Sequence, residues 1–473
     1  MSDPARDSLP TIVIGAGPVG LAAAAHLLER GLDPLVLEAG EQVGAAVASW
    51  GHVRIFSPWR YNIDAAARRL LEPAGWSVPD LDALPTGGEL VDDYLTPLAD
   101  TPQLSGRIHT RTRVLGVSRL TADKTRTIGR EGKGYRVRVV GPDGAVEDLL
   151  ARAVIDASGT YGTSNPLGVG GLPALGEADA RAYVTGPLPD VEGKDRVRFA
   201  GRRTLVVGMG HSAANTLLSL IQLAEDEPGT EVVWAIRGGS ARRLYGGGAD
   251  DELPARGLLG TRLKAAVDAG RVRLLTFVEI DRLDAGEDDV RVVGRSRDGV
   301  LDVTVDAIVN ATGFRPDLDV IREVRLDLDP ALECPAGIAE MIDPNFHSCG
   351  TVPPHGEKLL AQPDDGFYIV GMKSYGRAPT FLMATGYEQV RSIAAALAGD
   401  RTAADTVELN LPETGVCSSD LALDADGQQA GAACCGSTPA EPALLTLTSA
   451  PAGVGFATGV EHGRSGDAGG GCS

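Results

Sequence analysis

The run Thr-Ile-Val-Ile-Gly-Ala-Gly-Pro-Val-Gly, residues 11–20, is the part of this chain that says most about its fold. Its apolar residues 12–14 predict a strand buried on both faces of a parallel sheet. Gly15 permits a tight turn out of that strand, and Gly17 lets the backbone approach a pyrophosphate. Gly20 lets the next helix pack closely on the strand. The run therefore predicts a strand, a phosphate-binding turn and a helix.

The residues after this run fit the same unit. A helix is predicted over residues 18–29, with its free N–H groups and positive dipole end aimed at the phosphates. Gly31 is predicted to end it. The next apolar run, residues 34–37, stops at Glu38. That acid falls about 20 residues beyond the glycines, where a carboxylate binds ribose hydroxyls, so the first run predicts a dinucleotide site.

A second run of the same kind, Thr-Leu-Val-Val-Gly-Met-Gly-His-Ser-Ala, occupies residues 204–213. Its second strand is predicted over residues 231–236 and ends at Arg237, where the first unit has Glu38. A cation suits a 2′-phosphate, which an acid repels. The first loop is therefore predicted to hold FAD and the second NADPH. The alternative is that Arg237 and its neighbours only solvate a loop.

With these loops, residues 10–397 resemble flavoproteins that have two dinucleotide-binding domains, namely the class B flavin monooxygenases and their thioredoxin-reductase-like relatives. Val-Ile-Asp-Ala-Ser-Gly-Thr (154–160) is similar to the family segment where the FAD domain meets an inserted domain. Ala-Thr-Gly-Phe-Arg-Pro-Asp (311–317) is similar to the motif that closes the NADPH domain. Gly-Phe-Tyr-Ile-Val-Gly (366–371) resembles the last FAD strand. Residues 44–59 resemble the stretch that lies over the flavin ring in such monooxygenases.

Two departures from the family narrow the chemistry. The class B fingerprint has a Phe-x-Gly start and a histidine ahead of the second loop, whereas residues 183–190 read Tyr-Val-Thr-Gly-Pro-Leu-Pro-Asp. The disulfide-reductase branch needs a cysteine pair beside the flavin, but this chain has no cysteine before Cys334. A dithiol mechanism in the core is therefore excluded.

The predicted fold class is α/β, with two doubly wound Rossmann-like dinucleotide-binding domains and a flexible C-terminal tail. The NADPH domain, residues 166–318, is predicted to be inserted in the FAD domain, which comprises residues 1–165 and 319–397. Inside the first part, residues 107–153 predict a β-meander with a hairpin turn at Gly-Pro-Asp-Gly (141–144). Further helices are predicted over residues 88–95 and 379–397.

The motifs and the resemblance assign residues to each cofactor. For FAD they are Gly15, Gly17, Pro18, Val19, Gly20, Glu38, Trp50, Gly159 and Gly371. For NADPH they are Gly208, Gly210, His211, Ser212, Ala213, Arg237, Arg242, Arg243, Thr312 and Gly313. Catalytic residues stay unassigned, because a bound flavin carries the chemistry.

The substrate pocket has candidates from two stretches. They are Trp50, His52, Arg54, Ser57, Trp59, Arg60, Tyr61, Asn62, Lys373 and Tyr375. Lys373 and Tyr375 are predicted where a cation and a helix N-terminus would stabilise an anionic reduced flavin. Core packing of Trp50 and Trp59 and a structural role for His52 are the alternatives.

The last part of the chain, residues 398–473, is rich in small and polar residues and is predicted to be disordered. It holds four of the six cysteines, in a spacing that matches no tetrahedral zinc site. Leu-Pro-Glu-Thr-Gly-Val-Cys (411–417) and Cys-Cys-Gly (434–436) resemble flavoproteins found with bacterial arsenic-resistance genes. That resemblance implies that Cys417, Cys434 and Cys435 bind a trivalent metalloid. A tail whose thiols have no role is the alternative.

Charge and hydropathy exclude several partners. The chain has 473 residues and a net charge of -20, which argues against nucleic acid and against an anionic membrane surface. No apolar run reaches the ~20 residues of a membrane span, and a polar start predicts a cytoplasmic protein. Small-molecule substrate, O2 and a second copy in a homodimer are the expected partners.

The preferred interpretation is an NADPH- and FAD-dependent monooxygenase that acts on a small soft nucleophile or a metalloid. A reductase that passes electrons to thiols or to a protein acceptor is the first alternative. A thiol-based arsenite-binding protein is the second. The sequence does not name the substrate.

Overall fold

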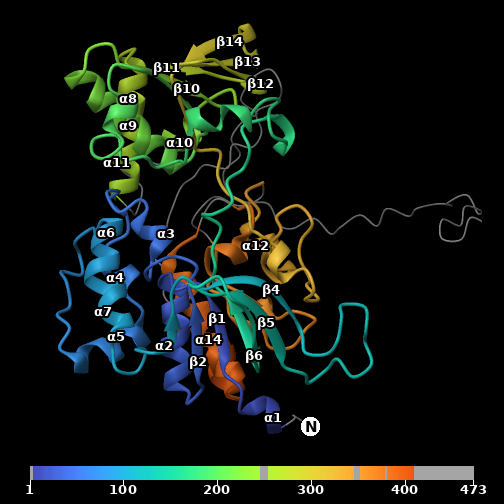
Figure 1. The fold of residues 1–473 in the computed structure, drawn as a ribbon. Helices are drawn as coiled ribbons and strands as arrows, with labels where there is room; N and C mark the ends of the chain where they lie inside the picture. Colours follow the sequence, from blue (N-terminus) through green and yellow to red (C-terminus); the bar gives the residue numbers. More distant parts are fainter. Residues whose placement is uncertain (1–3, 246–253, 346–351, 379–380, 410–473) are drawn as a thin grey trace, which may run out of the picture. The chain divides into compact units, whose positions relative to one another are not determined.

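The computed structural model describes residues 4–245, 254–345, 352–378 and 381–409. Its first sheet has five parallel strands in the order β16-β7-β1-β2-β3 (Figure 1). They are β1 (Thr11–Ile14), β2 (Pro34–Leu37), β3 (Ile108–His109), β7 (Ala153–Asp156) and β16 (Phe367–Ile369). The predicted bounds of α2 (Pro18–Glu29) and β2 are confirmed, whereas β1 begins one residue earlier than predicted, at Thr11.

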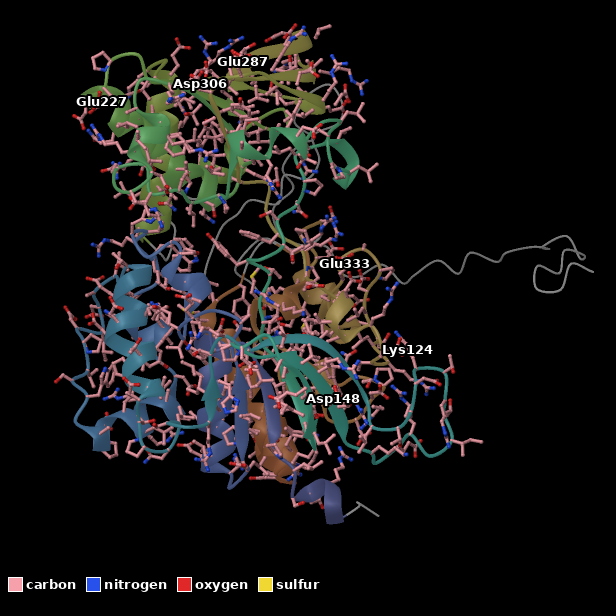
Figure 2. The ribbon with its side chains drawn as sticks, in the orientation of Figure 1. Lys124, Asp148, Glu227, Glu287, Asp306 and Glu333 are labelled. Carbon is pink, nitrogen blue, oxygen red and sulfur yellow. The ribbon has the colours of Figure 1, made fainter. Side chains whose placement is uncertain are left out.

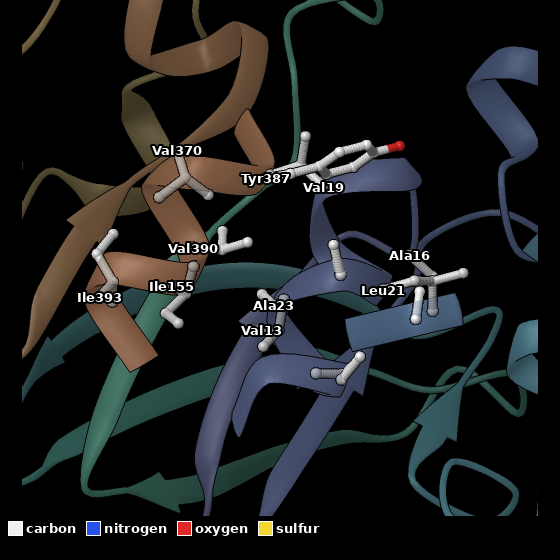
Figure 3. Close-up of a cluster of buried hydrophobic side chains, with 14 of the residues drawn as sticks. Val13, Ala16, Val19, Leu21, Ala23, Ile155, Val370, Tyr387, Val390 and Ile393 are labelled. Carbon is white, nitrogen blue, oxygen red and sulfur yellow. The ribbon is translucent and has the colours of Figure 1, made fainter. Parts of the chain in front are cut away.

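Different layers cover the two faces of this sheet. On one face α2 and α14 (Met383–Leu397) pack side by side, and Leu21, Ile155 and Val390 share their core (Figure 3). The other face carries the antiparallel strands β4 (Arg113–Arg119), β5 (Tyr135–Val140) and β6 (Val146–Ala151), as the predicted meander requires. Because both faces are covered, all four residues of β1 are buried.

The second sheet repeats this plan. Its parallel strands run in the order β11-β10-β9-β15-β8. They are β8 (Val184–Thr185), β9 (Arg203–Val207), β10 (Glu231–Ala235), β11 (Arg273–Leu275) and β15 (Ala307–Asn310). Helices α9 (His211–Asp226) and α11 (Pro254–Asp268) pack on one face. Strands β12 (Glu279–Ala285), β13 (Val290–Ser296) and β14 (Gly299–Val305) cover the other.

All strands of the second sheet lie between β7 and β16 in the chain. The second unit is therefore inserted in the first, and the predicted fold class is confirmed. The domain boundaries at residues 165, 318 and 397 stay predictions.

Short helices complete the two units. In the first they are α1 (Pro4–Asp7), α3 (Ala45–Ala48), α4 (Trp59–Asn62), α5 (Ala65–Leu71), η1 (Glu72–Ala74), α6 (Gly87–Leu90), η2 (Val91–Leu95) and α7 (Thr96–Ala99). Later in the chain they are η3 (Val169–Gly171), η4 (Asp179–Tyr183), α8 (Arg196–Phe199), α10 (Arg242–Tyr245), η6 (Asp319–Ile321), α12 (Ala336–Ile342), α13 (Glu357–Leu360), η7 (Gly371–Tyr375) and α15 (Arg401–Asp405).

Two predicted helices have different bounds in the structure. The helix expected over residues 88–95 starts at Gly87, because Thr86 and Glu89 form a capping box there, and helical turns continue to Ala99. The last long helix starts at Met383 instead of residue 379. Residues 379–380 lie outside the described part of the chain.

Helical structure also continues past residue 397, into the predicted tail. Asp400 caps α15 by accepting a hydrogen bond from Ala403 N. The Ser392 hydroxyl donates to Ala404 O at 2.6 Å, and Arg401 pairs with Glu357 at 2.6 Å. These contacts hold α15 against α13 and α14. The composition of residues 398–409 did not indicate that this part of the chain packs on the first unit.

Acidic side chains are paired with arginines on the outside of both units. Asp148 on β6 accepts hydrogen bonds from Arg138 and Arg136 at 2.8 and 2.7 Å, and these bonds lower the pKa of Asp148 to about 2 (Figure 2). Glu227 pairs with Arg196 at 2.9 Å. Within the described residues, no helix is both long enough and apolar enough to cross a membrane.

Candidate functional site: two glycine turns at the switch points

Each glycine turn lies where the strand order of its sheet reverses. In the first sheet this point is between β1 and β7, and a β carbon at position 15 would lie 2.8 Å from Ala157 O. In the second it is between β9 and β15, and a β carbon at position 208 would lie 2.0 Å from Ala311 O. Open α/β sheets bind ligands in the crevice at this point.

The three glycines of the first turn have different reasons to be glycine. Gly15 has a φ of +98°, which an L side chain rarely adopts. A β carbon at Gly20 would lie 1.9 Å from Gly15 O, so only glycine lets α2 pack on the turn. At Gly17 a β carbon would have no protein atom within 4 Å, and φ is an ordinary -76°. The fold itself therefore does not require glycine at position 17. A pyrophosphate that lies against the backbone would require it, because a side chain would occupy the same space.

The start of α2 and the end of β2 supply the partners of such a ligand. Gly17 is the N-cap of α2 without a side-chain cap, and Pro18 follows at its first turn. Glu38 accepts hydrogen bonds from Ala16 N and Gly40 N, both at 2.7 Å. The carboxylate therefore lies directly beside the turn and keeps lone pairs for ribose hydroxyls. These residues fit the adenosine pyrophosphate part of FAD.

The second turn has the same construction. Gly208 has a φ of +131°, and Gly210 is the N-cap of α9 with no protein atom near a β carbon placed on it. His211 and Ser212 form the first turn of α9, and Ala213 is fully buried. Position 210 thus fits a second pyrophosphate in the way that Gly17 fits the first.

The hydrogen-bond register corrects the predicted place of Arg237. Gly15 N donates to Leu37 O at 2.7 Å, and Gly208 N donates to Ala235 O at 3.0 Å. Ala235 therefore corresponds to Leu37, so Ile236 stands where Glu38 stands. Arg237 lies one residue further on, because β10 ends at Ala235 and not at Ile236.

This register still leaves the second site suited to a 2′-phosphate. Ile236 is buried and carries no charge that could repel one. Arg237 and Arg242 are exposed close behind it. The side chain of Arg243 lies outside the described part of the chain.

Lys373 differs from its predicted role. It is 1% exposed, and its Nζ donates to Asp156 Oδ2 at 2.7 Å and to Ser158 Oγ at 3.1 Å. Its charge is therefore neutralised between the end of β7 and η7, and it is not a free cation for a reduced flavin. The prediction failed because the partner, Asp156, is 217 residues away in the chain.

Tyr375 is likewise buried, at 2% exposure, and burial raises the pKa of its hydroxyl. Its ring packs against His355 and Phe381, with centroid distances of 5.9 and 5.1 Å. The raised pKa keeps this hydroxyl protonated near neutral pH, and the ring packs as part of η7.

A buried polar network that sequence reasoning missed holds η7 in place. Gly371 N donates to Gln389 Oε1 at 2.8 Å, and Gln389 Nε2 donates to Ser374 Oγ at 2.9 Å. Gln389 Nε2 also lies 2.9 Å from His355 Nε2, while His355 Nδ1 lies 3.0 Å from Pro353 O. A carbonyl only accepts, so Nδ1 carries a proton, and an amide nitrogen only donates, so Nε2 accepts from Gln389 and carries none; His355 is therefore neutral in this arrangement.

The predicted pocket stretch divides into buried and exposed side chains. Trp59 is a core residue at 4% exposure. Ser57 and Asn62 are buried and bonded to each other at 2.8 Å, so they hold the loop. Trp50 is half-buried and leaves room only for glycine at position 87.

The remaining candidates of this stretch face solvent or its edge. His52, Arg54 and Arg60 are exposed, and Tyr61 is half-buried. Arg60 pairs with Asp82, and Arg54 donates to Leu84 O at 2.5 Å. The side chains of the stretch that a substrate could reach are thus the exposed His52, Arg54 and Arg60 and the half-buried Trp50 and Tyr61.

The other predicted cofactor residues lie next to the two turns, with Gly159, Thr312 and Gly313 in loops and Gly371 at the start of η7. Gly159 and Gly371 have positive φ values, and a β carbon at 371 would lie 3.4 Å from Val19. Gly313 also has a positive φ, of +92°. The Thr312 hydroxyl lies 2.9 Å from Asn165 O, a partner that the sequence did not indicate.

The described residues hold one free cysteine, Cys334. It is buried, and burial raises the pKa of its thiol to about 12. Within those same residues no group of three or more His, Cys, Asp or Glu side chains could bind a metal. Cys349 and the thiols at 417, 434 and 435 lie outside the described part of the chain.

Two parallel sheets, one inserted in the other and each with a glycine turn at its switch point, define a flavoprotein fold with two dinucleotide-binding domains. The chain belongs to the pyridine nucleotide-disulphide oxidoreductase family, whose model matches residues 12–335. The predicted resemblance at family level is thereby confirmed.

Solved structures share this fold over most of the chain. Bacillithiol disulfide reductase Bdr from Bacillus cereus superposes with a TM-score of 0.61 at 19% identity, covering 83% of this chain and 99% of that one. The FAD-bound cadaverine monooxygenase DfoA from Erwinia amylovora has a TM-score of 0.57 at 14% identity, covering 86% and 99%. The predicted cofactor pair, FAD with a pyridine nucleotide, agrees with the family and with these neighbours.

A curated relative matches a shorter region. Digeranylgeranylglycerophospholipid reductase from Methanosarcina acetivorans is 30% identical over 173 residues. That match covers 32% of this chain and spans 42% of the relative's length.

Proposed function

We propose that this protein is an NADPH- and FAD-dependent oxidoreductase, and specifically a monooxygenase for a small molecule. The observation that carries the proposal is the combination of two dinucleotide turns with the lack of any cysteine in residues 1–333. The family takes its name from disulfides, but this core offers no dithiol to receive electrons. A bound flavin would instead pass electrons taken from NADPH to O2 or to an external acceptor.

The chain's own residues have binding roles in this proposal. The N-termini of α2 and α9 hold the two pyrophosphates, because unpaired N–H groups and the helix dipole favour anions. Glu38 binds the ribose of FAD. Arg237 and Arg242 bind the 2′-phosphate of NADPH.

The buried polar groups of η7 support the site without taking part in proton transfer. Lys373 is paired with Asp156, and Tyr375 and His355 are enclosed by packing and hydrogen bonds. Proton transfer to a substrate would therefore fall to an exposed group such as His52 or to water.

A reductase for disulfides or for a protein acceptor is the second candidate, and the likeness to the bacillithiol disulfide reductase favours it. Such a reductase would have to act without a protein dithiol beside the flavin. The two candidates differ in their need for O2.

The deciding experiment compares NADPH consumption with and without O2. The purified FAD-loaded protein is given amines, thioethers or arsenite in air, and low-mass disulfides under nitrogen. A monooxygenase consumes one O2 per NADPH and forms an oxygenated product when its substrate is present. Two results together would favour the reductase over the monooxygenase. They are fast NADPH oxidation with a disulfide under nitrogen, and formation of hydrogen peroxide without an oxygenated product in air.

A further inference from the structure

The two glycine turns are held in place by different side chains. In the first turn the middle residue, Ala16, donates its N–H to the Glu38 carboxylate. In the second turn that arrangement is impossible, because Ile236 occupies the position of Glu38. The middle residue there is Met209, and no described atom accepts its N–H.

A tryptophan holds the second turn through a different backbone group, the carbonyl of its first glycine. The Trp234 indole Nε1 donates to Gly208 O at 2.7 Å, and Gly208 N donates to Ala235 O at 3.0 Å. Trp234 is fully buried in β10 and belongs to the core under α9. Both backbone groups of Gly208 are therefore bound to β10, and the strand fixes the conformation of this residue.

The bond to Gly208 O has a consequence for the next amide. In a trans peptide the C=O and the following N–H point in opposite directions. Holding Gly208 O on Trp234 therefore turns the Met209 N–H away from β10. No described atom accepts the N–H of Gly210 either. Two unpaired donors thus stand side by side at the N-terminus of α9, where anions bind.

We propose that Trp234 is a positioning residue for the nicotinamide dinucleotide: its indole N–H orients the 208–209 peptide so that the turn presents its free N–H groups to the pyrophosphate. The inference rests on the proposed role of the second turn. Trp234 stabilises the second turn, as Glu38 stabilises the first, but from a different position in the strand. By strand register, the residue of β2 that corresponds to Trp234 is Val36.

The test uses Trp234→Phe in the FAD-loaded protein, with dissociation constants for NADP+ and NAD+ measured by calorimetry. Losing one neutral hydrogen bond should raise the dissociation constants of both nucleotides by about twofold to tenfold, because both nucleotides contain the pyrophosphate. FAD occupancy, read from visible absorbance, should stay unchanged. A residue that only fills the core would change the unfolding temperature and leave both dissociation constants as they are.

Trp76→Phe is the matched control, because the Trp76 indole also donates to a backbone carbonyl, Asp93 O, at 2.7 Å. This variant should not affect nucleotide affinity. If Trp234→Phe does not fold, 3-benzothienylalanine at position 234 keeps the shape of the side chain and replaces the N–H with sulfur.

The results separate this inference from the proposed function. Unchanged affinities in the position 234 variants, with NADP+ selectively weakened by Arg237→Ala, would overturn the role of Trp234 and leave the function standing. A wild-type protein that binds neither nucleotide would overturn both.

Discussion

At the scale of single residues, the most informative position is Gly17, because the protein itself gives no reason for a glycine there. Its φ is accessible to any residue, and a β carbon would meet no protein atom within 4 Å. Gly20 is the opposite case, since a β carbon there would run into Gly15 O.

We expect Gly17→Ala to lose FAD while the fold persists. The added methyl group occupies the space of the pyrophosphate and nothing else. Flavin absorbance of the purified protein and its circular dichroism are the measurements. Gly116→Ala in β4, where a β carbon also has open space, is the control and should keep FAD. Gly20→Ala should instead destabilise the fold, so full FAD occupancy in Gly17→Ala would contradict the assignment of the first turn.

Arg237 gives a second prediction at this scale. Arg237→Ala should raise the Michaelis constant for NADPH more than that for NADH, since one charge-assisted hydrogen bond to phosphate contributes about 1.5–3 kcal/mol, or roughly one to two factors of ten. Steady-state kinetics with both nucleotides measures this. Arg113→Ala, an exposed arginine on β4, should change neither constant. Equal effects of Arg237→Ala on both nucleotides would mean that Arg237 does not contact the 2′-phosphate.

At the scale of elements, a buried ion pair joins the ends of β7 and η7. Lys373 and Asp156 are both almost fully buried, and Ser158 bonds to each of them. Removing one charge leaves the other buried without a partner, which costs more than removing both.

Lys373→Met should therefore lower the free energy of unfolding by about 3–5 kcal/mol, and the double variant Lys373→Met with Asp156→Asn should lose less than the sum of the single variants. Urea unfolding measures these changes. Arg291→Met breaks the exposed pair with Asp302 and should have almost no effect. Strict additivity of the two buried substitutions would show that they are not coupled.

The buried network at His355 predicts a pH dependence. Burial lowers the pKa of His355, so the unfolded chain, whose histidine has an ordinary pKa of about 6.5, takes up a proton first as the pH falls. Stability is therefore lost as the pH drops from about 7 toward the lowered pKa. The contribution is at most about 1.4 kcal/mol per pH unit.

His355→Gln keeps an acceptor for Gln389 and removes the titration. Urea unfolding at several pH values between 7.5 and 5 should give a smaller slope of stability against pH in the variant than in the wild type. Parallel slopes would show that His355 does not titrate differently in the folded and unfolded states.

At the scale of the whole molecule, the flavoprotein body ends later than the composition suggested. Removal of all residues after Gly399 would delete α15 and the bonds that Arg391, Ser392 and Glu357 make to it. Truncation after residue 409 keeps these contacts.

We expect the truncation after 409 to retain NADPH oxidation and the unfolding temperature of the full chain, and the truncation after 399 to unfold at a lower temperature. The metalloid role of Cys417, Cys434 and Cys435 stays a prediction from the sequence. Equilibrium dialysis with arsenite should show binding to the full chain and not to the protein ending at 409. Equal binding by both would rule out the tail as the metalloid site.

Elements whose causes are local could be predicted from the amino-acid sequence alone. The apolar run before Gly15, the glycine spacing and the acid at Glu38 predicted α2 and β2 to the residue and β1 to within one residue, because turn geometry and helix capping depend on neighbours a few positions apart. The same reasoning found the β5–β6 hairpin and the second turn.

The pairing of the polar groups, by contrast, became apparent only in the folded molecule. Lys373 reads as a surface cation until β16 places it beside Asp156, and Arg237 reads as the counterpart of Glu38 until the register assigns that position to Ile236. Trp234 has no role that the sequence indicates, and its bond to Gly208 O appears only in the folded structure. Such pairings depend on how strands that are far apart in the chain align. The residues next to each of these positions in the sequence do not indicate that alignment.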